Sequence, residues 1–380
     1  MESEVVKKFL FIDKSCYRRR QDLIVARNFL LINGWMECCN LKEADSVIFF
    51  TCGFSRTKIV DILNEIGKIR GTMKSDAEFI LGGCLPITSS ESLDGIFNGK
   101  LISPSDFSAL DALPNIKIKS EEFLKKFGND VICMIPNHYA KSKISDIPLK
   151  LTSILKRMAS GHNATSGKRI GIFLSTGCLR KCSYCAARFA TGDLKSKPLD
   201  AIIQKFTENL KLGYGEFELH ADSIGDYGLD IGTNLGELLD RILDINVRFS
   251  IAIYDLHPLS FLKYFEKIIL LCKAKKIYYL HVPLQSGNER ILKLMNRSCD
   301  VNDLREKLLE IKSFKRVYMQ TTIIIGFPTE TMEEFEDTLN FLTDVKFNDV
   351  WVHFYSDMPN TESSKLTGKN RQEYYAGKIE

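Results

Sequence analysis

The sequence contains no apolar run that approaches the roughly 20 residues of a membrane-spanning helix. Its first eight residues also lack the apolar stretch of a secretory signal peptide. The net charge is small, +4 from 52 basic and 48 acidic residues, whereas dedicated RNA-binding domains are usually far more basic. These absences predict a cytoplasmic protein with no membrane partner. They neither require nor exclude a nucleic-acid partner.

Cysteine, in contrast, is abundant. Eleven cysteines in a cytoplasmic chain favour metal or redox chemistry over disulfide bonds. Three of them, Cys178, Cys182 and Cys185, form the pattern C-x3-C-x2-C within one loop. Three thiolates suit an iron–sulfur cluster and leave one iron of a four-iron cluster without a protein ligand. Structural zinc is the alternative, but it normally takes a fourth Cys or His. Neither nearby histidine, His162 or His220, pairs with a second CxxC.

The first third of the chain alternates apolar strands with helices, the pattern of a parallel sheet. We expect strands at residues 9–13, 45–50 and 78–83, and helices at 19–33 and 57–71. A cysteine follows each strand: Cys16, Cys52 and Cys84 in turn. Because ligand sites gather at the carboxyl ends of parallel strands, these thiols are expected to converge on a second cluster. The alternative is that each is a small buried apolar residue, which is also our interpretation of the remaining cysteines.

A second series of strands and helices begins near residue 169. Its expected strands lie at residues 170–174, 216–220, 247–251, 277–282, 319–325 and 350–354. Six βα units, with the cysteine loop after the first strand, predict an open, partial (β/α)6 barrel behind an N-terminal open parallel sheet. The expected α/β organisation is a sheet domain at residues 1–140, a linker at 141–168 rich in turn formers, the barrel at 169–360 and a tail at 361–380.

The cysteine loop, with Tyr184 before its last cysteine, resembles the radical S-adenosylmethionine (SAM) superfamily. The resemblance implies a [4Fe–4S] cluster on Cys178, Cys182 and Cys185, whose open iron binds the amino and carboxylate groups of SAM. One electron, from a donor of the flavodoxin or ferredoxin type, then cleaves SAM to a radical that abstracts a substrate hydrogen. In such a reaction the protein positions and shields the cofactor that carries the chemistry.

Further motifs resemble the methylthiotransferases within that superfamily, and together they cover nearly the whole chain. They are Phe-Thr-Cys-Gly-Phe at residues 50–54, Gly-Cys-Leu at 83–85, the loop at 222–230, Pro-Leu-Gln-Ser-Gly at 283–287, Ile-Leu-Lys-Leu-Met-Asn-Arg at 291–297 and Gly-Phe-Pro-Thr-Glu-Thr at 326–331. This resemblance implies that Cys16, Cys52 and Cys84 hold an auxiliary [4Fe–4S] cluster. Sulfur carried there would enter a substrate C–H bond, with one SAM supplying the methyl group and another the radical.

The same motifs suggest residues that contact SAM or substrate. Contacts to SAM are expected from Tyr184, Glu218, Asp222, Gln285, Ser286 and Gly326, and contacts to substrate from Arg18, Arg19, Arg20 and Tyr227. The alternative for Gln285 and Ser286 is a role in a turn, and for Glu218 and Asp222 it is a helix cap or a surface position. A short basic run is otherwise a solvated face. Arg297 is expected to hold a carboxylate or to cap a helix.

Features expected to face the substrate depart from the family pattern. The run Cys16-Tyr17-Arg18-Arg19 and the stretch at residues 186–197 differ from it, and no counterpart of the family's C-terminal TRAM domain, which helps bind tRNA, follows. We therefore expect a sulfur-inserting enzyme, a methylthiotransferase, that acts on a peptide or small molecule. One alternative is a tRNA methylthiotransferase that acts without its own TRAM domain. The other is a non-catalytic iron–sulfur sensor.

Overall fold

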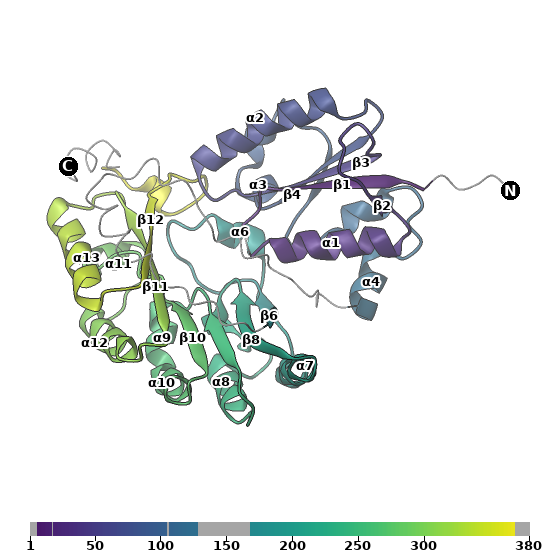
Figure 1. The fold of residues 1–380 in the computed structure, drawn as a ribbon. Coiled ribbons are helices and arrows are strands. Elements are labelled where there is room, and N and C mark those ends of the chain that lie inside the picture. The colour runs from purple at the N-terminus through teal and green to yellow at the C-terminus, as the bar shows by residue number, and fades with distance from the viewer. Residues whose placement is uncertain (1–5, 17, 105, 128–167, 369–380) are drawn as a thin grey trace. The chain divides into compact units, whose positions relative to one another are not determined.

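The computed structural model describes residues 6–16, 18–104, 106–127 and 168–368. The chain divides into two compact units (Figure 1). Unit 1 comprises Met1–Cys133, Cys185–Gly192 and Ser356–Thr361, and unit 2 comprises Met134–Tyr184, Asp193–Tyr355 and Glu362–Glu380. The expected linker lies outside the described residues except at Lys168, so the boundaries at residues 140 and 168 stay predictions. Within the described ranges, no helix has the length and apolar character needed to span a membrane.

Unit 1 contains a five-stranded parallel sheet in the order β2-β1-β3-β4-β5. Its strands are β1 (Lys8–Asp13), β2 (Met36–Glu37), β3 (Ser46–Thr51), β4 (Glu78–Gly83) and β5 (Lys100–Ile102). This is the strand order of flavodoxin-like folds, whose ligands bind at the carboxyl ends of the first and third strands, where the order reverses. The expected parallel sheet is confirmed. The sequence did not predict β2 and β5, which have only two and three residues.

Helices cover both faces of this sheet. They are α1 (Arg20–Ile32), α2 (Arg56–Thr72), α3 (Leu85–Thr88) and α4 (Ser120–Phe127). Alternation along β3 separates two apolar cores, because successive strand side chains point to opposite faces. Val47 and Phe49 belong to the core that contains the buried isoleucines of α2, while Ile48 and Phe50 belong to the core that contains Phe29 of α1. The sheet is therefore buried on both faces, which fixes the positions of its strand ends.

Two short segments from later in the chain complete unit 1. The first contains α6 (Ala187–Thr191), which follows the cysteine loop, and the second is Ser356–Thr361, which follows the last strand of the barrel. Ala186 and Met358 are 4% and 2% exposed and lie in the core beside α2. Arg56 donates from its backbone to Ser356 Oγ at 3.1 Å. Neither segment was expected to belong with the N-terminal sheet.

Unit 2 contains a seven-stranded sheet in the order β12-β11-β10-β9-β8-β6-β7. Six strands are parallel and one is antiparallel: β6 (Lys168–Thr176), β8 (Tyr214–Ala221), β9 (Ser250–Ile253), β10 (Ile277–His281), β11 (Tyr318–Ile325), β12 (Asp349–Phe354) and, antiparallel to β6, β7 (Lys195–Ser196). The expected partial barrel of six parallel strands is confirmed.

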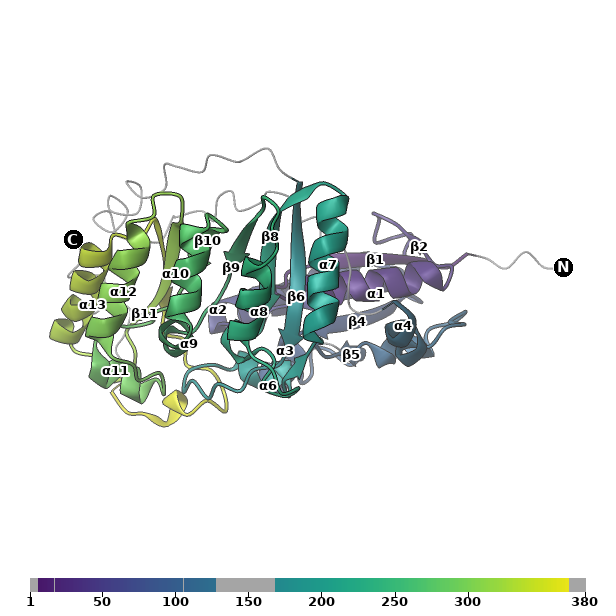
Figure 2. The ribbon, with the colours of Figure 1, turned by 90° about the horizontal axis from the view of Figure 1, so that it is seen from below.

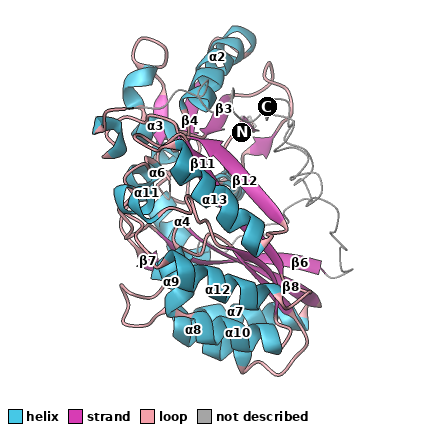
Figure 3. Ribbon diagram, turned by 90° about the vertical axis from the view of Figure 1, so that its left-hand side faces the viewer, coloured by secondary structure: helices cyan, strands magenta, loops and turns pink. Residues whose placement is uncertain are grey.

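Helices cover the outer face of this sheet. They are α7 (Leu199–Lys211), α8 (Leu235–Leu243), α9 (Pro258–Lys263), α10 (Phe265–Lys273), α11 (Glu289–Leu294), α12 (Val301–Lys312) and α13 (Met332–Val345). Figure 2 and Figure 3 show α8, α10 and α12 side by side along the barrel. Along β8, Phe217 and Leu219 join the core beneath the helices. Glu216, Glu218 and His220 alternate with them and therefore face the inside of the barrel.

The third barrel strand does not lie where the sequence predicted it. The expected strand was 247–251, but β9 begins at Ser250, and Val247 is 56% exposed. The register is set by β8, because Glu216 pairs with Ser250. An exposed valine has the same apolar character in the sequence as a buried one, so the pattern began the strand three residues too early.

Candidate functional site

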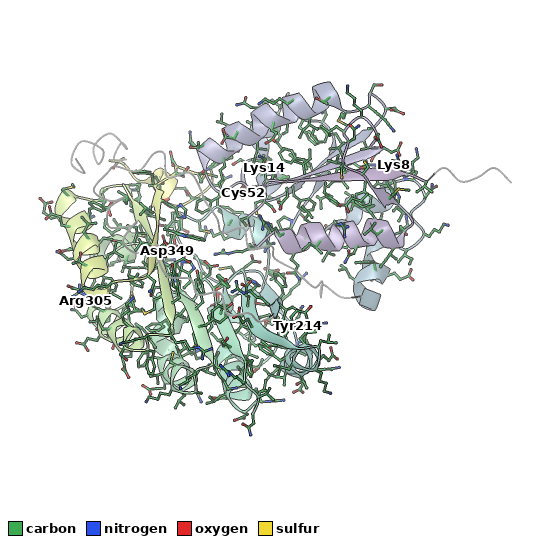
Figure 4. All side chains as sticks on the ribbon, viewed as in Figure 1. Lys8, Lys14, Cys52, Tyr214, Arg305 and Asp349 are labelled. Atoms are coloured by element: carbon green, nitrogen blue, oxygen red, sulfur yellow. The ribbon has the colours of Figure 1, made fainter. Side chains whose placement is uncertain are left out.

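Two of the three N-terminal cysteines stand together at the reversal point of the unit 1 sheet. Cys16 follows β1 and Cys52 follows β3, where Figure 4 labels it. The two thiols form a hydrogen bond that, opposed by burial, lowers the pKa of Cys16 to about 6. The positive charge of Arg18 and the backbone N–H of Arg19 lower it further. Cys16 is therefore prepared to act as a thiolate, which is the form that binds metal.

The third thiol is placed by two glycines. Gly83, at the end of β4, has a φ of +94°, and a Cβ there would lie 2.2 Å from the Thr51 carbonyl oxygen. A Cβ on Gly53 would lie 1.9 Å from Thr88 Oγ1. The loops after β3 and β4 consequently approach closely. The Cys84 N–H donates to the Thr51 carbonyl at 3.1 Å, so Cys84 and Cys52 leave the sheet from neighbouring strand ends. The hydrogen bond with Cys16 and burial raise the pKa of Cys52.

These three thiols fit an iron–sulfur cluster in their chemistry. Cys52 and Cys84 are 5% and 7% exposed, and a buried, electropositive set of thiols is what a thiolate-ligated cluster requires. In the parts of the chain that are described, no three Cys, His, Asp or Glu side chains already stand in a metal-binding arrangement. The fit therefore rests on the contact of Cys16 with Cys52 and on the loops that bring Cys84 near them.

The second cysteine loop begins directly after β6 and is held by two carboxylates of the segment that follows β8. Gly177 has a φ of +85°, and a Cβ there would lie 2.1 Å from the carbonyl oxygen of Asp193. Its N–H donates to Asp222 Oδ2 at 2.9 Å. Asp226 accepts from the backbone of Leu179 at 3.3 Å and pairs with Arg180 at 3.0 Å. Asp222, expected to contact SAM, thus holds the backbone of the loop.

A buried guanidinium stands behind Cys182. Arg297 is 5% exposed, and its Nη1 donates to Cys182 Sγ at 3.4 Å while Nη2 donates to the Pro283 carbonyl at 2.7 Å. Its Nε has no hydrogen-bond partner among the described residues. Burial disfavours the charge, but the pKa of Arg297 is raised by Tyr184 and Cys182. A buried cation needs an anion nearby, so this arrangement fits a thiolate at Cys182. The bond from Nη2 to a backbone carbonyl agrees with the capping alternative, and a carboxylate partner from a ligand stays a prediction.

Glu218, another expected SAM contact, is bound by neighbours inside the barrel. Arg169 Nη1 lies 3.3 Å from its Oε1, the Tyr254 hydroxyl donates to Oε1 at 3.3 Å, and His220 Nε2 lies 3.3 Å from Oε2. Burial alone would raise the pKa of Glu218, but the hydrogen bond with His220 and the charges of His220 and Arg169 bring it below its usual range. The carboxylate is therefore ionised and already bonded within unit 2. A helix-cap role is wrong.

Gln285 has the features of a ligand-binding residue. It follows β10, its φ is +74°, and it is 8% exposed. Its backbone is fixed by bonds to β11: the N–H donates to the Thr322 carbonyl, and the carbonyl accepts from Ile324. Its side-chain Oε1 has no partner within the described residues. A strained backbone and an unpaired buried acceptor at a strand's carboxyl end are typical of a binding site.

The other expected SAM contacts, Ser286, Gly326 and Tyr184, have partners within unit 2. Ser286 is fully buried and its Oγ accepts from the Asn288 backbone at 3.2 Å, which agrees with the turn alternative. Gly326 has a φ of +76°, and its N–H donates to Glu330 at 2.7 Å. Tyr184 packs, partly buried, against the apolar cluster around Phe327. A role of these three in binding SAM stays a prediction.

The expected substrate contacts include one correction. Tyr227 is fully buried in the barrel core, and its hydroxyl donates to the Lys197 carbonyl at 3.0 Å, so it is a packing residue. Arg19 is 5% exposed and pairs with Asp22 at 3.2 Å. Arg20 donates to Asp13 at 3.2 Å. Both charges are thus balanced within unit 1, and Arg18 acts on Cys16 electrostatically.

Known proteins resemble this chain in sequence and in fold. The model of the radical SAM superfamily matches residues 172–342. A probable threonylcarbamoyladenosine tRNA methylthiotransferase from Pyrococcus horikoshii is 38% identical over 92% of this chain and 77% of the relative. A tRNA-2-methylthio-N(6)-dimethylallyladenosine synthase from Staphylococcus epidermidis is 27% identical over 95% of this chain and 67% of the relative.

A solved structure shares the fold alone. It is the radical SAM methyltransferase TsrM from Kitasatospora setae, with a TM-score of 0.60 and 12% identity over 94% of this chain and 74% of that one. The superfamily uses a [4Fe–4S] cluster and SAM. That Cys178, Cys182 and Cys185 hold this cluster stays a prediction. The level of identity to the Pyrococcus horikoshii relative over nearly the whole chain settles the family. This chain belongs to the radical SAM methylthiotransferases and is a transferase enzyme.

Proposed function

We propose that the enzyme inserts methylated sulfur into a C–H bond of a tRNA adenosine derivative, with two [4Fe–4S] clusters. The observation that carries the proposal is the position of Cys16, Cys52 and Cys84, which follow the carboxyl ends of the adjacent parallel strands β1, β3 and β4. A radical SAM enzyme that only generates a radical needs the single loop at Cys178. A second group of three thiols supports a second cluster, and therefore a place where sulfur is held.

The assignment of groups to residues follows from this. Cys178, Cys182 and Cys185 would hold the SAM-binding cluster, and Cys16, Cys52 and Cys84 the auxiliary one. When bound, these groups supply the radical that opens the C–H bond and the sulfur that replaces the hydrogen. The chain's own part is to stabilise thiolates, through Arg18 at Cys16 and Arg297 at Cys182, and to fix the loops.

The substrate class is proposed from the relatives. The names of both curated relatives given above place their activity on modified adenosines of tRNA, threonylcarbamoyladenosine in one and N(6)-dimethylallyladenosine in the other. The expectation of a peptide or small molecule gains no support from them, so tRNA is our preferred substrate. An enzyme that modifies one adenosine needs few contacts to the neighbouring bases if its contacts to phosphates position the RNA. The net charge of +4 neither requires nor excludes such phosphate contacts.

Iron and acid-labile sulfide counts test the two-cluster claim. Anaerobically purified parent protein should hold about eight irons, and Cys16→Ala about four. Cys39→Ala, which removes an exposed cysteine, is the matched control and should keep the parent count. Equal counts in parent and Cys16→Ala would refute the auxiliary cluster.

Product analysis tests the reaction and the substrate. The reduced protein should produce 5′-deoxyadenosine from SAM, which the sensor alternative does not predict. With tRNA that carries N6-modified adenosine, mass spectrometry of the nucleosides should detect the methylthio product, and binding should weaken steeply with salt. Deoxyadenosine formation without any tRNA product would leave the radical chemistry standing and reject tRNA in favour of the peptide or small-molecule class.

A further inference from the structure

The family chemistry alone does not explain the position of Arg297. Its guanidinium lies in the interior of unit 2, and its Nη1 stands 3.4 Å from Cys182 Sγ. No carboxylate of the described residues pairs with it, unlike Arg180, which pairs with Asp226. We propose that Arg297 sets the reduction potential of the SAM-binding cluster through its charge and its N–H bond to Cys182. The inference rests on the proposed assignment of Cys182 as a cluster ligand.

The charge argument comes from the surroundings of Arg297. An isolated buried cation is costly unless an anion compensates it. The neighbours that favour its charge are Tyr184, Cys182 and Cys299, and none of them is a carboxylate. Burial and the positive charges of Arg297 and Arg180 lower the pKa of the buried His257 to about 2, in keeping with an electropositive interior behind the cysteine loop. A thiolate-ligated cluster is an anion that would balance this charge.

The hydrogen-bond argument distinguishes Arg297 from other contacts of the loop. Cys178 Sγ accepts a backbone N–H from Arg180 at 3.4 Å, which any residue at position 180 except proline would supply. The bond to Cys182 Sγ comes from a side chain and brings a full positive charge. Hydrogen bonds to ligand sulfurs and nearby charge are among the terms that set cluster potentials. Because reduction adds negative charge, a nearby cation favours the reduced state and raises the potential.

The test measures the potential and not the activity. The parent for the experiment is the full chain with Cys16, Cys52 and Cys84 replaced by alanine, so that one cluster remains. Arg297→Met removes the charge and the bond, and Arg297→Lys retains the charge. Lys293→Met removes one positive charge from an exposed position on α11 and is the matched control. Each protein is titrated anaerobically with a low-potential reductant, and the reduced cluster is counted by electron paramagnetic resonance.

We expect Arg297→Met to need a lower potential than Lys293→Met. At a fixed potential its ratio of reduced to oxidised cluster should fall about tenfold, which is 59 mV for one electron. Arg297→Lys should lie closer to the parent. Equal midpoints for Arg297→Met and Lys293→Met would overturn the proposal. If Arg297→Met takes up no iron, Arg297→Gln, which removes the charge but keeps an N–H donor, is compared in its place. A midpoint below that of Lys293→Met supports the charge effect, and an equal midpoint or a failure to load overturns it.

Failure of this inference and failure of the proposed function give different results. Absence of iron from the triple-alanine parent would reject the assignment of the Cys178 loop, on which both depend. If the parent binds iron but the midpoint potential does not change on substitution of Arg297, only the role of Arg297 is rejected. The eight-to-four iron count tests the auxiliary site in a separate protein and is unaffected by either outcome.

Discussion

Asp222 Oδ2 accepts the backbone N–H of Gly177 at 2.9 Å, and this bond joins the end of β8 to the first turn of the cysteine loop. Gly177 is also confined by its neighbours. It has a left-handed φ of +85°, and the Asp193 carbonyl oxygen occupies the space where a Cβ would lie. The carboxylate therefore fixes the loop where its cysteines begin. The sequence placed Asp222 near the same chemistry but assigned it to SAM rather than to the protein backbone.

Replacing Asp222 should loosen the cysteine loop without unfolding the barrel. Asp222→Ala leaves the Gly177 N–H without this acceptor, at a cost of about 1–3 kcal/mol, whereas Asp222→Asn keeps an oxygen that can accept it. We expect the alanine variant to lose iron to a chelator several-fold faster than the asparagine variant. Asp240→Ala, which removes a surface carboxylate paired with Lys267, is the control and should match the parent. Equal rates for all three variants would show that the bond does not retain the cluster.

Gly83→Ala should destabilise unit 1 and weaken its iron site. The left-handed backbone costs a non-glycine residue about 1–2 kcal/mol, and the new Cβ would lie 2.2 Å from the Thr51 carbonyl oxygen. Gly67→Ala is the matched control, since Gly67 lies in α2 with open space around it. That substitution should stabilise the helix by about 0.5–1 kcal/mol. Denaturant unfolding and iron counts measure both. If Gly83→Ala and Gly67→Ala changed the free energy of unfolding in the same direction, the structural role given to Gly83 would be wrong.

Replacing Gln285 should weaken the binding of SAM without a large change in the stability of the protein. Gln285→Gly relieves the backbone strain and removes the unpaired amide, so the protein should stay within about 1 kcal/mol of the parent in stability. SAM should bind about tenfold more weakly if one hydrogen bond of about 1.4 kcal/mol is lost. Lys346→Gly removes a similar left-handed residue, φ +53°, from the end of α13. It should leave SAM affinity unchanged in equilibrium dialysis. Unaltered affinity in Gln285→Gly would remove Gln285 from the site.

The Glu218 network should give the barrel an acid-sensitive contribution to stability. Its pKa is lowered in the folded protein, so its contribution is complete above the unfolded carboxyl pKa of about 4.3. It is lost as the pH falls through the lower folded pKa. The parent should therefore exceed Glu218→Gln by a constant margin between pH 5 and 7, about 1–3 kcal/mol, and the margin should shrink below about pH 4. Urea unfolding at each pH measures it. The control Glu208→Gln, at an exposed position, should show no such margin. If the margin between parent and Glu218→Gln grew on acidification, the pKa of Glu218 would be raised on folding rather than lowered.

Much of the fold follows from local patterns. The strands before Cys16, Cys52 and Cys84 are continuous apolar runs that end in turns, so their positions and their shared sheet edge could be predicted from period and spacing. The same holds for the barrel, where five of six strands lie where the apolar runs do. The exception is β9, the third barrel strand. Its limits depend on the register with β8, and that register has no local signal in the sequence.

The parts that could not be predicted depend on contacts between distant residues. Arg297 looks like a helix-terminal residue in the sequence, and only the fold brings it to Cys182, 115 positions earlier. Tyr227 belongs to a family-like motif, so it was assigned to substrate, yet its ring is part of the core. Glu218 and His220 alternate on a strand in a manner typical of an exposed face. The barrel curvature places them instead inside a buried polar network.

The composition of unit 1 has a consequence for synthesis on the ribosome. Its apolar core includes Ala186 and Met358, and its α2 helix begins on a bond to Ser356. An emerging chain generally folds its N-terminal domain first. Here two residues of that core are encoded late, Met358 after nearly all of the barrel sequence. The sheet that carries Cys16, Cys52 and Cys84 is therefore encoded first, but its core is complete only once residue 358 has been translated.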